Sequence, residues 1–324
     1  MQLKFDPWNS DFGPSVSFSE TDDEQQVEVE TESEYSESEW TPISCEASSL
    51  DELVIVDGVR RVDAHLRLEG PTTSIPVLVG TYAAGGIFLR LGQQSNLWQA
   101  LRTPVVERVA LVLGEIPSAA RFPAEFQVLP VMGQKPERLT LELQQRMRLH
   151  ESLIAAELAE QHGALVLADG PLQNVLKMRG AGVVGYIKSH RRMLLPDRLL
   201  STLHSLPVRT RTPIVLLKAP EGSDAFERFT WYLRLAAPAP HETGLAGIVR
   251  LEVLADLGLE AARERAQATA GVLPRLVGGR HRDARSPQNL APIAALEKEL
   301  RHRMGDAALV TRILRKSIHG RGVA

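Results

Sequence analysis

The chain has 324 residues, of which 44% are hydrophobic and 24% are charged, and its formal net charge is −3. This average conceals two regions of opposite sign. Residues 1–52 hold 15 acidic residues and one basic residue, about −14, which leaves 36 basic and 25 acidic residues, about +11, in the rest. The basic region is long enough to bury a large core, and its charge favours anionic partners such as nucleic acid.

Several protein classes are excluded or disfavoured by composition. The single cysteine, Cys45, excludes an intramolecular disulfide framework and a cysteine-rich zinc module. No stretch of the chain reaches the roughly 18–20 apolar residues of a membrane span, and the first residues lack the cationic start and apolar run of a signal peptide. We therefore expect a cytoplasmic protein.

The N-terminal region is expected to be a separate acidic tail. Residues 17–52 are acidic, rich in serine and poor in apolar side chains, a composition that predicts disorder or loose attachment. The predicted organisation is thus a tail or linker over residues 1–52 and one domain over residues 53–324. Two interpretations of the tail remain open: a solubilising linker, or an acidic mimic that covers the basic body or recruits a partner.

From residue 53 onward, hydrophobic patterns predict first a β-meander and then alternating helices and strands. The strand expected at 53–56 ends at an Asp-Gly turn, and an Ala-Gly-Gly turn is expected to separate strands at 75–82 and 86–91. The other predicted strands cover 62–68, 105–113, 164–168, 182–187, 213–217, 229–235 and 247–254. The predicted helices cover 138–162, 258–269, 291–304 and 307–317. This order indicates an α/β domain with a mixed β-sheet flanked by helices.

Two of the predicted strands end in nearly the same sequence. Residues 53–58 read LVIVDG and residues 165–170 read LVLADG, so each strand delivers an aspartate, Asp57 or Asp169, at its carboxyl end. Ligands of open α/β sheets collect outside the carboxyl ends of strands, so the two aspartates could converge there. An Asp-Gly pair is also ordinary turn chemistry, and a purely structural role remains open.

The longest predicted helix offers a third carboxylate. Leu143, Met147, Ile154 and Leu158 form an apolar stripe along residues 138–162, and Glu151 lies on the edge of that stripe. Because the helix runs directly into the strand of Asp169, we expect Glu151 to point inward near that aspartate. A partly exposed Glu151 paired with Arg148 or another cation is the competing interpretation. Three carboxylates suit Mn²⁺ or Mg²⁺, which prefer hard oxygen ligands and can act as a pair in phosphodiester cleavage.

The order and spacing of these segments resemble the NurA nucleases. The resemblance rests on LVIVDG, the inward glutamate, LVLADGPL, GVVGYIKSHR, FTWYLRL and GIVRLEV, and it covers most of residues 53–290. It implies an RNase H-like fold, Mn²⁺-dependent cleavage of DNA with exonuclease and single-strand endonuclease activity, and a homodimer. It also implies a nucleoid-associated role in double-strand-break end processing with the hexameric ATPase HerA.

The same resemblance implies roles for five residues. Asp57, Glu151 and Asp169 match the family's metal-binding acids, and Lys188 matches a basic residue that holds the scissile phosphate or stabilises negative charge. His281 is the match for a late histidine that could bind metal or transfer a proton. The sequence departs from the family at Asp57, where DGVRR stands in place of the more usual DGS.

Arginines near these positions are the candidate DNA contacts. Residues singled out for this role follow the two aspartates or lie on a late strand: Arg60, Arg61, Arg179, Arg191, Arg192 and Arg250. Arg250 and Glu252 share a strand face, so an ion pair between them is the competing interpretation. Residues 275–324 add 11 basic residues against four acidic ones, either as a further DNA contact or as a solvated helical face.

Two other functions remain to be weighed against a nuclease. The protein could be a non-catalytic DNA-binding adaptor of a DNA translocase, although three intact acids argue against it. A phosphatase or nucleotide hydrolase is a weaker alternative, because there is no GxxxxGK[ST] loop and neither Asp-Gly is followed by the second acid of aspartyl-phosphate phosphatases.

Overall fold

The computed structural model describes most of the chain as a mixed α/β fold. The described residues are 28–45, 50–70, 72–93, 97–162, 164–172, 182–189, 194–219, 226–281, 283 and 285–319. Within these ranges, no helix is long and apolar enough to cross a membrane.

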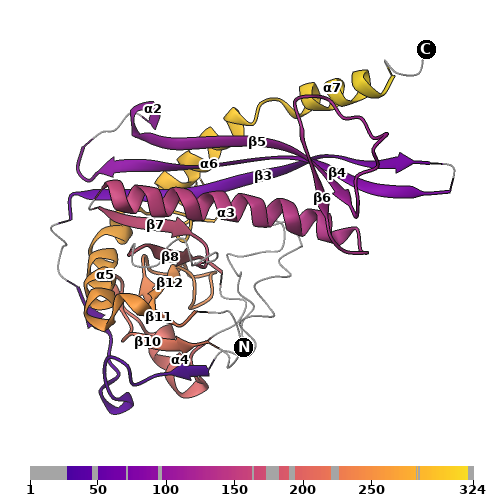
Figure 1. The fold of residues 1–324 in the computed structure, drawn as a ribbon. Helices are drawn as coiled ribbons and strands as arrows, with labels where there is room; N and C mark the ends of the chain where they lie inside the picture. Colours follow the sequence, from indigo (N-terminus) through magenta and orange to yellow (C-terminus); the bar gives the residue numbers. More distant parts are fainter. Residues whose placement is uncertain are drawn as a thin grey trace.

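One large sheet runs through the molecule, with helices against both of its faces (Figure 1). Among the described residues the sheet has 12 strands, and the main path is β1-β10-β11-β12-β8-β7-β3-β4-β5-β6. The strands are β1 (Glu28–Glu30), β2 (Ile43–Ser44), β3 (Glu52–Glu69), β4 (Ser74–Arg90), β5 (Leu101–Leu113), β6 (Gln127–Val131), β7 (Leu165–Asp169), β8 (Val184–Ile187), β9 (Thr210–Arg211), β10 (Val215–Lys218), β11 (Arg228–Arg234) and β12 (Ile248–Leu254). The helices are α2 (Leu97–Ala100), α3 (Glu137–Gln161), α4 (Asp197–His204), α5 (Leu259–Val272), α6 (Ala291–Arg303) and α7 (Ala307–His319).

The centre of the sheet has the expected RNase H-like arrangement. Its strands follow the order β5-β4-β3-β7-β8, in which β4 is antiparallel to both neighbours and β3, β7 and β8 are parallel to one another. The long helix α3 connects the antiparallel part of the chain to the parallel strand β7. The predicted mixed sheet flanked by helices is therefore confirmed.

The first hairpin is longer than predicted. Strand β3 continues through Asp57 and Gly58, which pair with Gly85 and Ala84 of β4, so the expected Asp-Gly turn is wrong. The Ala-Gly-Gly segment likewise lies inside β4 and does not break it. A side chain at Gly86 would approach Leu158 of α3 to 2.5 Å, so this glycine makes room for a helix and does not form a turn.

The sheet has two distinct apolar faces. On one face, Val54 and Val56 of β3 pack with Ile154 and Leu158 of α3; we call this the α3 face. On the other, the α6 face, Leu53 and Ile55 pack with α5 and with Leu296 and Leu300 of α6. Alternation along each strand assigns the remaining residues to a face, and Figure 1 shows α3 in front of the sheet with α6 behind it.

The predicted long helix and its stripe are confirmed. Helix α3 covers Glu137–Gln161, and Leu143, Met147, Ile154 and Leu158 are all buried in it. The later strands and helices also lie near their predicted ranges. The short helix α4 and strand β6, which contains a proline and adds to the edge of the sheet beside β5, were not predicted.

Part of the acidic N-terminal region belongs to the sheet. Strand β1 pairs with β10, and β2 pairs with β9. The carboxylate of Glu34 is buried, accepts hydrogen bonds from Arg211 at 2.8 and 2.9 Å, and accepts another from the backbone of Ile214 at 2.7 Å. Residues 28–45 are thus more firmly attached than their composition suggested, and residues 1–27 lie outside the described residues.

Candidate active site

Parallel pairing of β3 and β7 brings the two aspartates together. Val56 lies opposite Ala168 in the register, so Asp57 and Asp169 follow side by side on adjacent strands. Both lie on the α6 face, because Ile55 and Leu167 two residues earlier pack there. Strand β7 ends at Asp169 whereas β3 continues, so the predicted convergence is found even though Asp57 does not end its strand.

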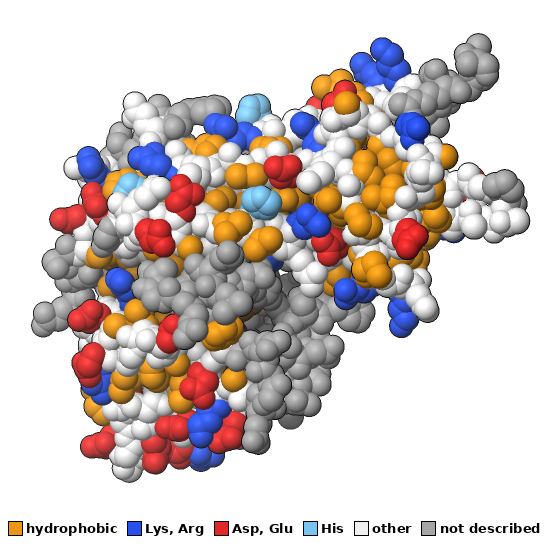
Figure 2. All heavy atoms as spheres, in the orientation of Figure 1, with side chains coloured by type: hydrophobic (Ala, Val, Ile, Leu, Met, Phe, Trp, Pro, Cys, Tyr) orange, Lys and Arg blue, Asp and Glu red, His pale blue; other side chains and the backbone are white. Residues whose placement is uncertain are grey.

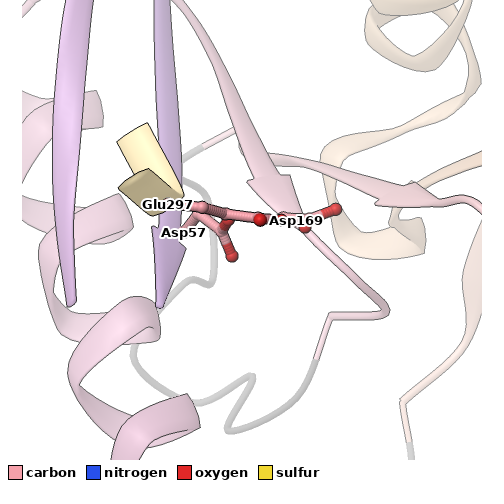
Figure 3. A group of neighbouring side chains, drawn as sticks. All are labelled: Asp57, Asp169 and Glu297. Carbon is pink, nitrogen blue, oxygen red and sulfur yellow. The ribbon is translucent and has the colours of Figure 1, made fainter. Parts of the chain in front are cut away.

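A third carboxylate reaches the same point from α6. One oxygen each from Asp57, Asp169 and Glu297 lies within 4.8 Å of the others, and the three side chains point toward one another (Figure 3). We call these three residues the acid group. Asp57 and Glu297 are each only 5% exposed, so water screens their negative charges poorly.

Glu297 was not identified from the sequence, although a signal was present. It lies on the edge of the buried stripe formed by Ile293, Leu296 and Leu300 in α6. Glu151 has the same position relative to the stripe of α3, and that position was the reason for expecting it to point inward. The same reasoning applied to α6 would have predicted Glu297 as an inward carboxylate.

Glu151 approaches the acid group from the opposite face of the sheet. It is 6% exposed, as predicted, and its carboxylate lies against Gly58, the residue after Asp57. Any side chain at position 58 would collide with Oε1 of Glu151, so only glycine permits this approach. Arg148 fixes the carboxylate by donating to Glu151 Oε2 at 3.2 Å and to the backbone oxygen of Asp169 at 2.7 Å.

Burial and like charges raise the pKa of two of these carboxyls. The pKa of Asp57 is raised well above its usual value by burial and by the negative charges of Asp169, Glu151 and Glu297, against an opposing effect of Lys188. Burial raises the pKa of Glu151 to about 7, although the charge of Arg148 opposes the shift. Among the described residues, neither Asp57 Oδ2 nor Glu151 Oε1 has a hydrogen-bond partner.

These properties fit a divalent cation. Buried carboxylate oxygens without a partner are costly, and a cation would compensate both their charge and their lost hydration. All the donors in the acid group are hard oxygen atoms, which Mg²⁺ and Mn²⁺ prefer. The arrangement can therefore bind such an ion and present it to a phosphate.

Lys188 lies where the sequence placed it, directly after β8. Its ammonium donates to Asp169 Oδ2 at 2.5 Å and to Asn289 Oδ1 at 2.9 Å, and the residue is 8% exposed. The lysine thus pairs with Asp169, as Arg285 and Arg301 pair with Glu297, and its ammonium is close enough to neutralise additional negative charge at this site.

His281 is not brought into the acid group. It is exposed, and its imidazole packs back over Gly279 in the loop that precedes α6. The same segment contributes three other polar residues to the site, Asp283, Arg285 and Asn289, none of which was predicted. The partner of Asn289 is Lys188, 101 residues away, that of Arg285 lies on the next helix, and Asp283 contacts only its own loop, so sequence spacing alone does not connect them to the site.

The candidate DNA-binding arginines occupy different environments. Arg60 donates to Gln144, and burial together with the charge of Arg148 lowers the pKa of Arg60. Arg61 lies on the α6 face, donating to Asp63 at 2.6 Å and to the backbone oxygen of Gly305 at 2.9 Å. Arg179, Arg191 and Arg192 lie outside the described residues.

Arg250 does not lie on the face of the sheet that carries the acid group. It is 4% exposed and lies 3.7 Å from Glu252, the same-face ion pair that the strand pattern allowed. Its neighbours Val249 and Leu251 pack on the α6 face, so Arg250 lies on the opposite face of the sheet from Asp57.

Comparisons with solved structures find neighbours of this chain, whereas comparisons with families and curated proteins do not. No protein-family model matches the sequence, and no curated protein matches it. The chain is similar in structure to the NurA nuclease from Sulfolobus solfataricus, with a TM-score of 0.38 and 12% sequence identity, over 87% of this chain and 86% of that one. That protein is a member of the family that the sequence resembles.

Proposed function

We propose that this protein is a metal-dependent deoxyribonuclease that hydrolyses phosphodiester bonds at the acid group. The observation that supports this proposal most is the convergence of Asp57, Asp169 and Glu297 at one point, two of them almost fully buried, beside Lys188. Asp57 Oδ2 is buried here without a hydrogen-bond partner, which is costly unless a metal ion binds it, and the donors suit the ions that serve phosphoryl chemistry.

Asp57, Asp169 and Glu297 would hold the divalent ion, and Glu151 would complete the ligand set from the α3 side. When bound, one such ion or a pair of them supplies Lewis acidity that activates water and stabilises the leaving oxygen. Mn²⁺ or Mg²⁺ fits these oxygen donors. The proposed mechanism does not require His281, which is exposed.

The protein side chains position the substrate and balance its charge. The Lys188 ammonium faces the acid group and can stabilise negative charge that develops on the scissile phosphate. Arg148 holds the carboxylate of Glu151 and the backbone at Asp169 in place, so it sets the approach of the α3 side. Because the acids are buried, bulk water has little access to the site and competes less with the phosphate for Lys188.

The finer features of the proposal come from the resemblance to the NurA nucleases. They are exonuclease and single-strand endonuclease activity, action on double-strand-break ends, a homodimer, and partnership with a HerA-type hexameric ATPase. The basic character of residues 53–324 supports DNA as the substrate.

Replacing Asp57 or Asp169 by asparagine tests the proposal. Each substitution removes a charged ligand with almost no change in volume, so Mn²⁺-dependent cleavage of linear and single-stranded DNA should fall by about 1,000-fold or more. A matched control is Glu242→Gln, because Glu242 is also buried but pairs with Arg280 away from the acid group.

Unchanged cleavage in both aspartate variants would refute the nuclease assignment. A wild-type protein that binds DNA but does not cleave it in the presence of Mn²⁺ or Mg²⁺ would favour the non-catalytic adaptor.

A further inference from the structure

The loop between the short 3-10 helix η5 (Leu273–Leu276) and α6 reaches into the candidate active site through Asn289. This amide is 1% exposed, accepts a hydrogen bond from Lys188 at 2.9 Å, and donates one to Asp283 Oδ2 at 2.7 Å. Lys188 thus has one acceptor in the acid group, Asp169, and a second acceptor in this loop. A lysine ammonium on its flexible four-carbon stem needs such a second acceptor to be held in one place.

Asp283 is also connected to the acid group by a second chain of contacts, through Arg285. Asp283 accepts hydrogen bonds from the side chain of Arg285 at 3.3 and 3.2 Å and from its backbone nitrogen at 2.8 Å. Arg285 in turn makes a bidentate contact with the carboxylate of Glu297 at 2.9 and 2.8 Å. A two-point contact of this kind fixes the orientation of a carboxylate as well as its position.

The loop is itself held firmly against the sheet. The backbone nitrogen of Asn289 donates to Arg285 at 2.9 Å, and Tyr186 donates its hydroxyl to the backbone of Gln288 at 2.6 Å. Ser286 donates to the backbone of Gly278 at 2.5 Å. A loop with these attachments can transmit position to the residues that it holds.

We propose that Asp283 is a positioning residue that sets both Lys188, through Asn289, and Glu297, through Arg285. The proposal rests on the metal-dependent hydrolysis proposed above, and it assigns to this loop a role that no motif in it indicates. Asp283 does not touch the acid group itself, so it acts only through these two neighbours. Outer partners of this kind typically change metal affinity or rate by about 10–100-fold when they are removed.

Two measurements separate the two routes, namely the Mn²⁺ affinity by isothermal titration calorimetry and kcat with KM on a linear DNA. Arg285→Ala should weaken Mn²⁺ binding by about 10-fold or more, because Glu297 loses its two-point contact and keeps only a single one, from Arg301 at 3.0 Å. Asn289→Ala should lower kcat by a similar factor with KM nearly unchanged, because Lys188 still binds but is no longer held in place. Asp283→Ala should produce both effects.

Double-mutant cycles distinguish positioning from a general loss of structure. In a Glu297→Gln background, Arg285→Ala should have no further effect on Mn²⁺ affinity. In a Lys188→Met background, Asn289→Ala should have no further effect on kcat. If the role were purely structural, each substitution would cause the same loss in the mutant background as in the wild type.

Arg280→Ala provides the matched control. Arg280 lies in the same segment and makes a comparable contact with Glu242, at 3.0 and 2.9 Å, that does not lead to the acid group. This variant should unfold at a lower temperature, because Glu242 loses its partner, but should keep the Mn²⁺ affinity and kcat of the wild type.

Wild-type Mn²⁺ affinity and kcat in a folded Asp283→Ala variant would overturn the positioning role while leaving the proposed nuclease intact. A wild-type protein that neither binds Mn²⁺ nor cleaves DNA would instead refute the proposed function. If Asp283→Ala does not fold, Asp283→Asn, which keeps the side-chain size, and Asn289→Ala provide the same test.

Discussion

At the scale of single residues, the site depends on small side chains as much as on acids. Gly58 leaves the space that the Glu151 carboxylate occupies, and it follows directly after Asp57 on β3. The glycine of the DG motif is therefore explained here by close approach of a helix side chain, whereas its local sequence suggests a turn.

Gly58→Ala should displace the carboxylate of Glu151 and lower Mn²⁺-dependent cleavage by about 100-fold, because small misplacements of reacting groups have large effects on rate. Cleavage rates and thermal unfolding of the purified variant are the measurements. Gly278→Ala is the control, since a side chain there would meet its nearest neighbour at an ordinary 3.6 Å. A Gly58→Ala variant with wild-type cleavage would contradict the assigned role of Glu151.

The residues that could be predicted from sequence are those whose local pattern is unusual. Asp57 and Asp169 follow apolar runs, and Glu151 interrupts the edge of an apolar stripe, so each can be identified without a structure. Asp283 and Asn289 lie in a polar loop that has no such pattern, and only the tertiary fold places Asn289 beside Lys188. Local turn chemistry also gave the wrong end for β3, because pairing with β4 overrides the turn preference of Asp-Gly.

At the scale of secondary-structure elements, a buried ion pair adds to the strand pairing that attaches β1 and β2 to the sheet. The side chains of Glu34 and Arg211 are 1% and 4% exposed. Burial alone would raise the pKa of Glu34, but hydrogen bonds and charge from Arg211, the backbone of Ile214 and the charge of Arg263 outweigh it and lower the pKa. Composition predicted none of this, because acidity indicates solvation unless a buried partner is known.

The lowered pKa of Glu34 predicts that the attachment of residues 28–45 depends on pH. A carboxyl whose folded pKa lies below its ordinary value of 4.5 stabilises the folded state above about pH 4.5, and this contribution is lost as the pH falls through the folded pKa. Hydrogen exchange of β1 and β2 should therefore accelerate, relative to the rest of the sheet, as the pH falls below about 4.5.

Glu34→Gln should show faster exchange in β1 and β2 already at pH 7, together with a smaller change on acidification. Glu28→Gln is the control, since its side chain is 75% exposed in its pair with Lys218. Equal exchange of these strands in Glu34→Gln and the wild type at pH 7 would show that the buried ion pair does not hold the segment.

At the scale of the whole molecule, basic side chains of α7 lie beside the face of the sheet that carries the acid group. Acidic and basic side chains are interspersed over the face that carries α3, and basic side chains follow α7 at the upper right (Figure 2). Val310 and Leu314 of α7 pack on Val77 and Val79 of β4, opposite the face where Leu78 meets α3. Helix α7 therefore lies on the same side of the sheet as the acid group.

Exposed cations of α7 are expected to contact the DNA backbone. The double substitution Arg312→Glu and Lys316→Glu should weaken DNA binding for all sequences. It should also make the slope of log K against log salt concentration shallower, by the amount that corresponds to about two phosphate contacts. Titrations of fluorescent DNA at several salt concentrations measure both quantities. The control is the double substitution Lys135→Glu and Arg138→Glu, at and just before the start of α3 on the opposite face. If both double substitutions weakened DNA binding equally, a contact specific to α7 would be contradicted.

The central claim is that the acid group, including the glutamate from α6, holds the ion that cleaves DNA. Its most direct test is the rate of DNA cleavage as a function of Mn²⁺ concentration for the wild type and for Glu297→Gln. The site described here predicts that the substitution shifts the Mn²⁺ midpoint at least about 10-fold higher. Superimposable curves for the two proteins would contradict it.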